Sequence, residues 1–316
     1  MNAASRDKLL QSVINLFVAG AVALPILIFF LNGVPYKRGF FCNDETINHP
    51  YKSSTVPTSV LFGLGLGLPI LLILVVEVVV CSLAKRGAGV LERIVNFLHL
   101  TVGFCFGAAG SQCLVDIAKY SIGRLRPHFL DVCRPDYSLI DCGSAIKPRY
   151  VTEFECLGNP ELIAQGEQES RLEDAMVSFM SGHASFSFQM STFIILYLQA
   201  RFLHRSERRA TLLIPLVQFV AFVMAYFTSL SRISDYKHHA GDVLAGAILG
   251  ITVQVINVTC HMKLFSDNDL PRVDDIGIPG IGGNEVEASQ KRLSQNVSTE
   301  EDNTSVRLNS AFQADP

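Results

Sequence analysis

Three separated clusters of polar residues in this chain combine the side chains needed to bind and attack a phosphate group. The clusters are Lys119–Pro127 (KYSIGRLRP), Ser181–His183 (SGH) and Ser231–Asp242 (SRISDYKHHAGD). Lysine and arginine supply positive charge and N–H donors, and the fork of a guanidinium matches two oxygens of a phosphate group. An imidazole can attack phosphorus or transfer a proton near neutral pH. The sequence therefore predicts one phosphate-handling site where these clusters meet.

Individual residues can be given roles in such a site. His238 and His183 are the candidates for the imidazoles that attack phosphorus or transfer a proton. His238 and Asp242 are four residues apart, so an early helix start would put the carboxylate where it can hold one ring nitrogen of His238 and leave the other free to attack. Backbone N–H groups at a helix start favour an anion. The candidate phosphate-binding residues are Lys119, Arg126, Ser181, Gly182 and Arg232, with Arg124 as a further candidate.

The composition is typical of a polytopic membrane protein. Of the 316 residues 49% are hydrophobic and 17% are charged, and the mean hydropathy is positive, at +0.32. A helix needs about 20 apolar residues to cross the hydrocarbon core of a bilayer. The predicted fold class is therefore an all-α membrane protein, a bundle of six transmembrane helices. The runs that predict these spans are about 11–31, 57–83, 95–118, 178–200, 211–230 and 241–261.

Charges in the short loops predict the orientation of these spans, because Lys and Arg stay on the cytoplasmic side. They predict that the N- and C-termini are cytoplasmic, and Lys37-Arg38 is the strongest signal against this. The outer loops would then be about 32–56, 119–177 and 231–240, which places all three polar clusters on the outer face. The first apolar run is longer than the core of a secretory signal, and we interpret it as a retained signal anchor.

The chain divides into a short cytoplasmic N-terminus at 1–10, a six-span domain at 11–262 and a tail at 263–316. The tail is rich in Ser, Asn, Asp and Glu, which predicts a disordered cytoplasmic segment. The most favoured location is the plasma membrane, with the site extracellular, and a lumenal site in an internal membrane is the alternative. The outer loop from about 135 to 173 is expected to form either a small cap beside the site or a flexible loop.

The three motifs resemble those of a known family. The pattern KxxxxxxRP, SGH and SRxxxxxHxxxD resembles the type 2 phosphatidic acid phosphatase (PAP2) superfamily. Longer segments such as DIAKYSIGRLRPHFLDVC and SRISDYKHHAGDVLAG are similar to those of the animal integral-membrane lipid phosphate phosphatases, or phospholipid phosphatases. The resemblance covers approximately residues 10–262. It implies a PAP2-type helical bundle.

The resemblance also implies a mechanism. His238 would form a phosphohistidine, Asp242 would orient it, and His183 would protonate the leaving alkoxide and then activate water. The implied substrates are phosphatidate, lysophosphatidate, sphingosine 1-phosphate and ceramide 1-phosphate. No metal or other cofactor is implied, because lysine and arginine neutralise the charge that Mg²⁺ handles elsewhere.

Other functions compete with this interpretation. The chain could be a catalytically silent relative that binds lipid phosphates or membrane partners, although it keeps the lysine, arginines, histidines and aspartate of the motifs. A transporter or channel is a third class. The string His238-His239-x-x-Asp242 could also be part of a metal site, which the surrounding cations oppose. The predicted partners are lipid phosphates and the bilayer, without nucleic acid, and the sequence leaves a homo-oligomer open.

Acidic residues inside predicted spans are costly in a membrane and usually functional. For Asp116, about one turn before Lys119, we predict an ion pair that positions the lysine. Glu77 has no evident partner, and a structural hydrogen bond stays as open as a catalytic role. His128 also lacks a matching partner and is expected to be a packing or surface residue.

Four cysteines lie in the predicted outer loops, where disulfides persist. They are Cys42, Cys133, Cys142 and Cys156, and they permit three pairings. We favour Cys142 with Cys156, which closes a short loop, and Cys42 with Cys133.

Overall fold

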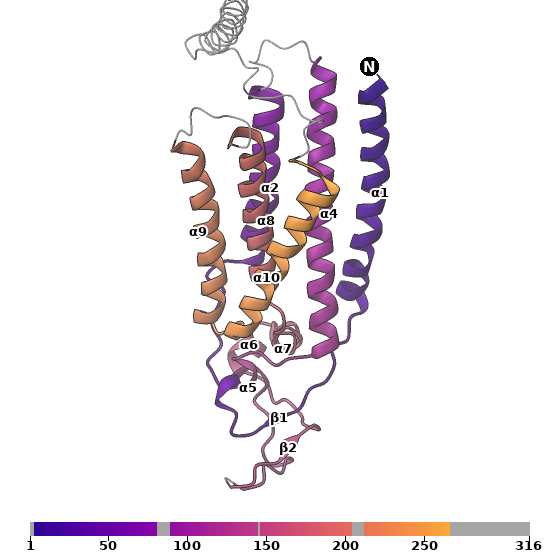
Figure 1. The fold of residues 1–316 in the computed structure, drawn as a ribbon. Helices are drawn as coiled ribbons and strands as arrows, with labels where there is room; N and C mark the ends of the chain where they lie inside the picture. Colours follow the sequence, from indigo (N-terminus) through magenta and orange to yellow (C-terminus); the bar gives the residue numbers. More distant parts are fainter. Residues whose placement is uncertain (1–2, 81–88, 145, 204–211, 266–316) are drawn as a thin grey trace, which may run out of the picture.

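The computed structural model describes residues 3–80, 89–144, 146–203 and 212–265, and these residues are mostly helical (Figure 1). The long helices are α1 (Ala3–Asn32), α2 (Thr58–Leu74), α4 (Val90–Ile122), α8 (Gly182–Leu198), α9 (Leu213–Ser234) and α10 (Ala240–Ile256). Helices α2, α8 and α10 are continued by π-helical segments, which are η2 (Val75–Val80), η3 (Gln199–Leu203) and η4 (Asn257–His261). The shorter elements are β1 (Phe40–Phe41), η1 (Glu45–Ile47), α5 (Phe129–Cys133), β2 (Tyr150–Val151), α6 (Pro160–Ala164) and α7 (Gln168–Ala175).

The long helices run alongside one another, and the short elements gather beyond one end of the bundle (Figure 1). We call the short elements and their connecting loops the cap. In the cap, β1 pairs antiparallel with β2, with Phe40 opposite Val151. A small apolar core built around Phe129, Val132 and Leu162 holds the cap together. The cap therefore has its own core, separate from those between the long helices.

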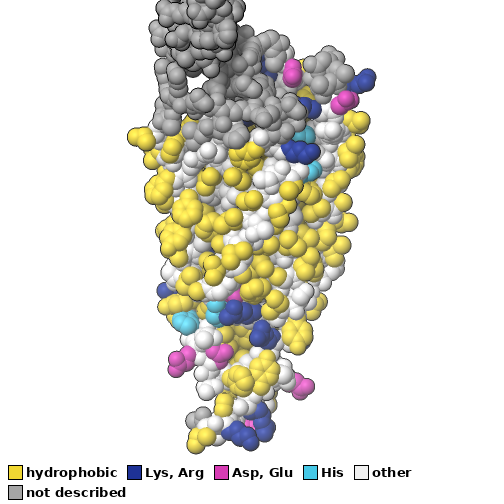
Figure 2. Space-filling model, in the orientation of Figure 1, with side chains coloured by type: hydrophobic (Ala, Val, Ile, Leu, Met, Phe, Trp, Pro, Cys, Tyr) yellow, Lys and Arg dark blue, Asp and Glu magenta, His cyan; other side chains and the backbone are white. Residues whose placement is uncertain are grey.

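The outside of the helical bundle is apolar. Figure 2 shows hydrophobic side chains over the middle of the visible face, with charged side chains nearer its two ends. Soluble monomers rarely expose apolar patches of this extent. Five helical segments are long and apolar enough to cross a membrane, namely Arg6–Asn32, Thr58–Val78, Val90–Ile122, Leu213–Ser234 and Ala240–His261. The chain is an integral membrane protein of the helical class, as the sequence predicted.

The sixth predicted span corresponds to α8, which is shorter and more polar than the other long helices. It packs against α2, α4, α9 and α10, so protein rather than lipid surrounds most of it. Two of its polar side chains make hydrogen bonds to neighbouring helices. Ser185 Oγ lies 2.7 Å from Ser111 Oγ, and Gln189 Nε2 donates to Gln254 Oε1 at 2.8 Å. A central helix can carry such residues, and six spans remain our prediction.

Glu77 has two partners inside the bundle. The guanidinium of Arg201 and the hydroxyl of Tyr197 both donate to Glu77 Oε1, the hydroxyl at 2.8 Å. All three side chains are buried. Of the two roles left open for Glu77, the structure favours a structural one, because this network joins η2 to α8 and η3 at the end of the bundle away from the cap.

Breaking this buried pair should destabilise the protein. Arg201→Met leaves the Glu77 carboxylate buried without its cation, and we expect a loss of about 3–5 kcal/mol in the free energy of unfolding. The double variant Glu77→Gln/Arg201→Met carries no unpaired charge and should recover most of the loss. Thermal unfolding of the purified protein in detergent measures both. An Arg201→Met variant as stable as the wild type would contradict the assignment.

The predicted ion pair between Asp116 and Lys119 is wrong. Asp116 Oδ1 instead accepts a hydrogen bond from Gln112 Nε2 at 2.8 Å, and no salt bridge joins the two charged residues in the described structure. Side chains on a helix lean toward its N-terminus, so Asp116 meets the residue one turn before it rather than the one after.

The favoured disulfide pairing is also wrong. The bonds are Cys42–Cys142 and Cys133–Cys156. Closeness in sequence suggested Cys142 with Cys156, but tertiary contacts decide the pairing. Pairing of β1 with β2 brings the first loop to the segment that carries Cys142, and a bridge between Pro135 and Cys156 brings the latter beside the end of α5.

Candidate functional site

The first polar cluster begins in the last turn of α4 and turns back under the bundle at Gly123. This glycine has a left-handed conformation, with φ of 57°, and its N–H donates to the carbonyl of Lys119 at 3.1 Å, a common way for helices to end. A Cβ at this position would collide with the carbonyl of Tyr36. The turn directs Arg124 and Arg126 toward the segment that precedes α8.

That segment, residues 174–181, contacts all three polar clusters, and we call it the strap. The N–H of Arg126 donates to the carbonyl of Ala175, and the N–H of Ser178 donates to the carbonyl of Arg124, both at 2.8 Å. At its other end, the N–H of Ser181 donates to the carbonyl of Asp242 at 3.0 Å. The strap therefore connects the first cluster to the third and leads directly into the second.

The strap also orients His238. The Nδ1 atom of His238 lies 2.7 Å from the carbonyl oxygen of Ser178. Because a carbonyl only accepts hydrogen bonds, Nδ1 carries the proton and Nε2 keeps its lone pair. Burial lowers the pKa of His238 well below its ordinary value, and Arg126 and Lys119 lower it further. His238 is therefore a neutral imidazole with a free nitrogen, the form that a nucleophile requires.

Asp242 does not orient His238 in the way that the sequence suggested. Its Oδ2 lies 4.0 Å from His238 Nδ1, beyond hydrogen-bond distance, because the carbonyl of Ser178 occupies that position. The buried carboxylate instead accepts hydrogen bonds from Arg124 Nη1 and the Ser178 hydroxyl, both at 2.6 Å, and from the N–H of His239 at 3.1 Å. Asp242 thus acts on His238 through Ser178 and through the start of α10.

The cations of the site are held in different ways. Arg126 pairs with Asp174 in the strap at 2.5 Å. Arg232 is almost fully buried, donates to Asp235 Oδ2 at 2.8 Å and reaches Ser54 Oγ at 3.2 Å. The side chain of Lys119 has no hydrogen bond or ion pair in the described part of the chain, and its electrostatic partners include Arg126 and Asp174. Its ammonium is the cation most available to a ligand.

The second cluster forms the start of α8. Ser181 caps this helix, with its side chain accepting from the N–H of Ala184 at 3.4 Å. The N–H groups of Gly182 and His183 belong to the first turn, where a helix offers them no acceptor. Gly182 faces the first cluster, since the position that a Cβ would take lies 3.8 Å from Lys119 Nζ. These amides and this ammonium can contact one anion.

The first loop of the chain is part of the site, although no role for it could be predicted from the motifs. The Nε2 atom of His183 lies 3.2 Å from the carbonyl of Val56. The preceding residue, Thr55, donates to Asp235 through its N–H at 2.8 Å and through its hydroxyl at 2.7 Å. The only signal in the sequence is the hydroxyl run Ser53-Ser54-Thr55, which by itself is common in loops.

Lys237 and His128 are two further buried residues near the site, and the motifs did not indicate a role for either. Lys237 is buried, and its Nζ lies 3.8 Å from the ring centre of Tyr51, a cation–π contact. Burial and the charge of Arg126 lower the pKa of Lys237 to about 8. His128, which we expected to be a packing or surface residue, is buried with its Nδ1 2.7 Å from the carbonyl of Tyr236, and burial lowers its pKa to about 3.

The arrangement suits attack on a tetrahedral oxyanion. Lysine, arginine and helix N–H groups converge on one region, with one oriented neutral imidazole and a second imidazole at the start of α8. His239 contacts Asp242 at 3.2 Å, but no group of three or more His, Cys, Asp or Glu side chains arranged to hold a metal occurs within the described ranges. The residues present therefore fit phosphoryl chemistry based on histidine and cations.

Comparison with known proteins agrees with this chemistry. Residues 100–266 match the model of the PAP2 superfamily. The chain is 42% identical to a putative phosphatidate phosphatase of Drosophila melanogaster over 80% of this chain and 68% of the relative. It is 40% identical to phospholipid phosphatase 1 of Rattus norvegicus and 37% identical to phospholipid phosphatase 2 of Homo sapiens, over 81% of this chain and 86% and 83% of those relatives. No solved structure matches it significantly. The matched region contains all three polar clusters, and the chain belongs to the PAP2 superfamily.

Proposed function

We propose that this phosphatase hydrolyses the phosphate monoesters of membrane lipids through a phosphohistidine on His238. The observation that carries the proposal is the hydrogen bond from His238 Nδ1 to the carbonyl of Ser178, which leaves Nε2 as a free nucleophile beside Arg126 and Lys119. The names of the relatives, phosphatidate and phospholipid phosphatases, support a lipid substrate.

The reaction would proceed in two displacements. His238 Nε2 attacks phosphorus, the bond to the lipid oxygen breaks, and His183 gives its proton to the departing alkoxide. His183 then takes a proton from water, whose oxygen attacks the phosphohistidine and releases inorganic phosphate and the free imidazole. The phosphoryl oxygens would be held by Lys119, Arg126, Ser181, Gly182 and Arg232.

An apolar groove beside the site supports a lipid substrate. It has a volume of about 460 Å³ and lies between α2 and α9, with α8 as its floor. It begins at Val56, whose carbonyl contacts His183. Exposed side chains of both helices line it, so it opens on the lipid-facing side of the bundle. Its lining includes Leu64, Leu68, Phe186, Val220, Met224 and Phe227.

A lipid whose phosphate group is bound in the site would thus have its acyl chains beside the apolar groove. The headgroup would be recognised by the cations, whereas the apolar groove has few polar groups to distinguish lipid backbones. We therefore propose phosphatidate, lysophosphatidate, sphingosine 1-phosphate and ceramide 1-phosphate as substrates.

Filling the groove should reduce activity on long-chain lipids. Leu64→Trp and Val220→Trp place large rings where an acyl chain would lie, and displacing the chain should cost about 1–3 kcal/mol, which is a loss of roughly 5-fold to 150-fold in kcat/KM for a long-chain phosphatidate. Activity on a short-chain soluble phosphate monoester should be unchanged. Leu244→Trp, which adds a ring on the exposed face of α10 outside the groove, is the control. Equal losses on both substrates would contradict a role in chain binding.

We also propose that the six-span domain at 11–262 has both termini in the cytoplasm. The site would then face the cell exterior or, in internal membranes, the lumen. Two disulfides in the cap support this orientation, because such bonds persist in oxidising compartments. The predicted disordered tail at 263–316 lies almost entirely outside the described residues, and homo-oligomers remain compatible with the proposal.

Phosphate release from a panel of the four lipids tests the proposed function directly. Purified protein should release phosphate from each lipid in the presence of a chelator, since lysine and arginine neutralise the substrate charge. Binding of these lipids without release of phosphate would favour the catalytically silent alternative.

A further inference from the structure

The first residue of the strap places a carboxylate against the cations of the site. Asp174 Oδ1 accepts from Arg126 Nη2 at 2.5 Å, and the carbonyl of the next residue, Ala175, accepts from the N–H of Arg126 at 2.8 Å. Two successive residues thus hold both the side chain and the backbone of Arg126. None of the three motifs includes Asp174.

This contact uses only one edge of the guanidinium. Arg126 is 6% exposed, and its Nε is buried without a hydrogen-bond partner among the described residues. An unmatched buried donor is costly, and an oxyanion is the ligand that would satisfy it. Asp174 therefore holds Arg126 at Nη2, while the neighbouring Nε–H is left for a phosphate oxygen.

Asp174 is ionised and interacts with several cations. Burial raises the pKa of its carboxyl group, but attraction to Arg126, Lys119 and Lys237 outweighs this and leaves the pKa below its ordinary value. Its side chain is 40% exposed, so solvent screens part of the interaction. A negative charge at this point reduces the mutual repulsion of three cations before any substrate arrives.

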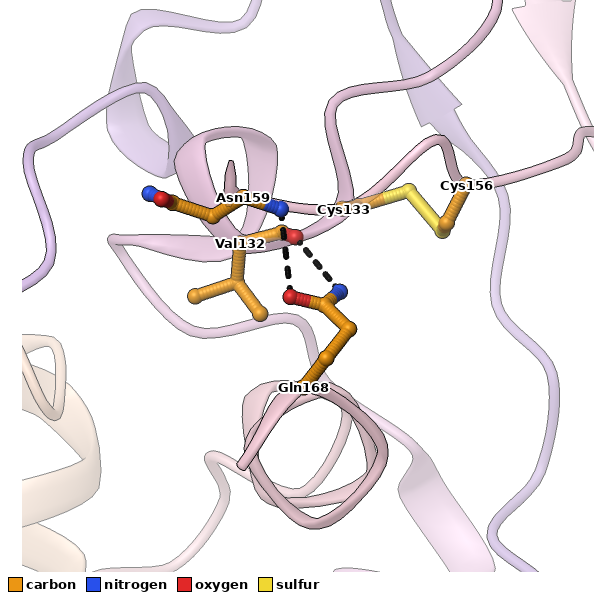
Figure 3. Close-up of a disulfide and its surroundings, with 5 residues drawn as sticks. All are labelled: Val132, Cys133, Cys156, Asn159 and Gln168. Atoms are coloured by element: carbon orange, nitrogen blue, oxygen red, sulfur yellow. Dashed lines mark hydrogen bonds between the residues drawn. A yellow bond between two sulfur atoms is a disulfide. The ribbon is translucent and has the colours of Figure 1, made fainter. Parts of the chain in front are cut away.

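The cap fixes the helix that carries Asp174. At the start of α7, Gln168 Nε2 donates to the carbonyl of Val132 at 3.0 Å, and its Oε1 accepts from the N–H of Asn159 at 3.1 Å. Figure 3 shows this bridge beside the disulfide Cys133–Cys156, which joins the two segments that Gln168 contacts. Because α7 is anchored in this way, the structure favours a carboxylate that stays in place over one that moves away when substrate binds.

We propose that Asp174 is a positioning residue of the phosphate site, which clamps Arg126 by one edge and keeps the surrounding cations together. The inference rests on the proposed function and deepens it. Its role is exerted through Arg126 rather than by contact with the substrate.

Charge and geometry at this position can be separated by three variants. Asp174→Asn removes the charge, Asp174→Glu keeps it, and Glu173→Gln makes the same charge change at an exposed neighbour on α7. For Asp174→Asn we expect KM for a lipid phosphate and the inhibition constant of orthovanadate to rise roughly tenfold to a hundredfold, with a smaller change in kcat. Asp174→Glu should recover most of the loss, and Glu173→Gln should behave as the wild type.

The pH profile distinguishes positioning from a merely structural role. Asp174 raises the pKa of Lys237, which is otherwise faced by positive charges and by the ring of Tyr51. Without the carboxylate, Lys237 loses its proton at lower pH, so the alkaline limb of kcat/KM should move to lower pH. Loss of stability alone would leave that limb in place. The positive groups around Lys237 are Arg126, Arg171 and Arg232, and His128 also lies near it.

Thermal stabilisation by orthovanadate gives a readout that does not depend on activity. A wild-type protein that gains stability with orthovanadate but releases no phosphate from lipids would refute the proposed function and still allow the clamp to be tested. Orthovanadate binding that is unchanged or tighter in Asp174→Asn would overturn the inference, because the carboxylate would then be irrelevant to the phosphate position or would occupy it.

Discussion

His238→Ala should lower phosphate release from lipid phosphates by roughly ten-thousand-fold or more, since it removes the proposed nucleophile. The structure gives a specific reason for this choice between two adjacent histidines. His238 Nδ1 is bound to the carbonyl of Ser178, and its ring is buried, whereas His239 Nδ1 contacts the carboxylate of Asp242 at the start of α10. Phosphate release from radiolabelled phosphatidate by purified protein measures the loss.

A covalent label provides the matching control for His238. Wild-type protein quenched in the presence of labelled substrate should carry acid-labile, base-stable phosphate, as a phosphohistidine does, and His238→Ala should carry none. His261→Ala, at the opposite end of α10 and its π-helical continuation, should be labelled as the wild type is. Labelling that persists in His238→Ala would show that another group is the nucleophile.

His183→Ala should lower the rate by roughly a hundredfold to ten-thousand-fold, the usual contribution of one acid–base group. Its ring is held near the start of α8 by the carbonyl of Val56, 3.2 Å from Nε2. The size of the loss should depend on the leaving group. An alkoxide of a lipid needs a proton as it departs, whereas a nitrophenolate does not.

Comparing a lipid phosphate with an activated aryl phosphate therefore tests the role of His183. The first step should be impaired much less for the aryl ester than for the lipid, and the labelled phosphoenzyme should accumulate because water is no longer activated. An equal loss on both esters, without accumulation, would contradict the assignment and indicate that His183 only shapes the site.

The side chains of the site could be predicted because each sits in a short pattern with a fixed spacing. Lys119 and Arg126 are seven residues apart, and a helix end followed by a turn at Gly123 lets both face the strap. The helical membrane fold could also be predicted, because an apolar run long enough to cross a bilayer must satisfy its own backbone hydrogen bonds, and a helix does so.

The groups that hold the site residues in place could not be predicted, because many of them are backbone atoms. The carbonyls of Ser178 and Val56 contact the two histidines, and any residue type has a carbonyl. Asp242 was expected beside His238 from its spacing of four residues. The true arrangement depends on Ser178, which lies 60 residues before His238 and carries no motif signal.

The disulfide pairing and the partner of Asp116 were predicted wrongly for a related reason, and the partner of Glu77 could not be predicted. Local spacing favoured Cys142 with Cys156 and Asp116 with Lys119, whereas strand pairing in the cap and the lean of side chains on α4 decided otherwise. Glu77 found its partner in Arg201, at the end of a helix more than a hundred residues later. Such pairings depend on tertiary structure that no short window of sequence contains.

The groove between α2 and α9 opens on the side of the bundle that faces lipid, while the cations lie at the cap end. An enzyme built this way meets its substrate by diffusion within a two-dimensional sheet. Its velocity should follow the mole fraction of phosphorylated lipid in the vesicle and should fall when inert phospholipid is added, even though the amount of substrate per litre is unchanged.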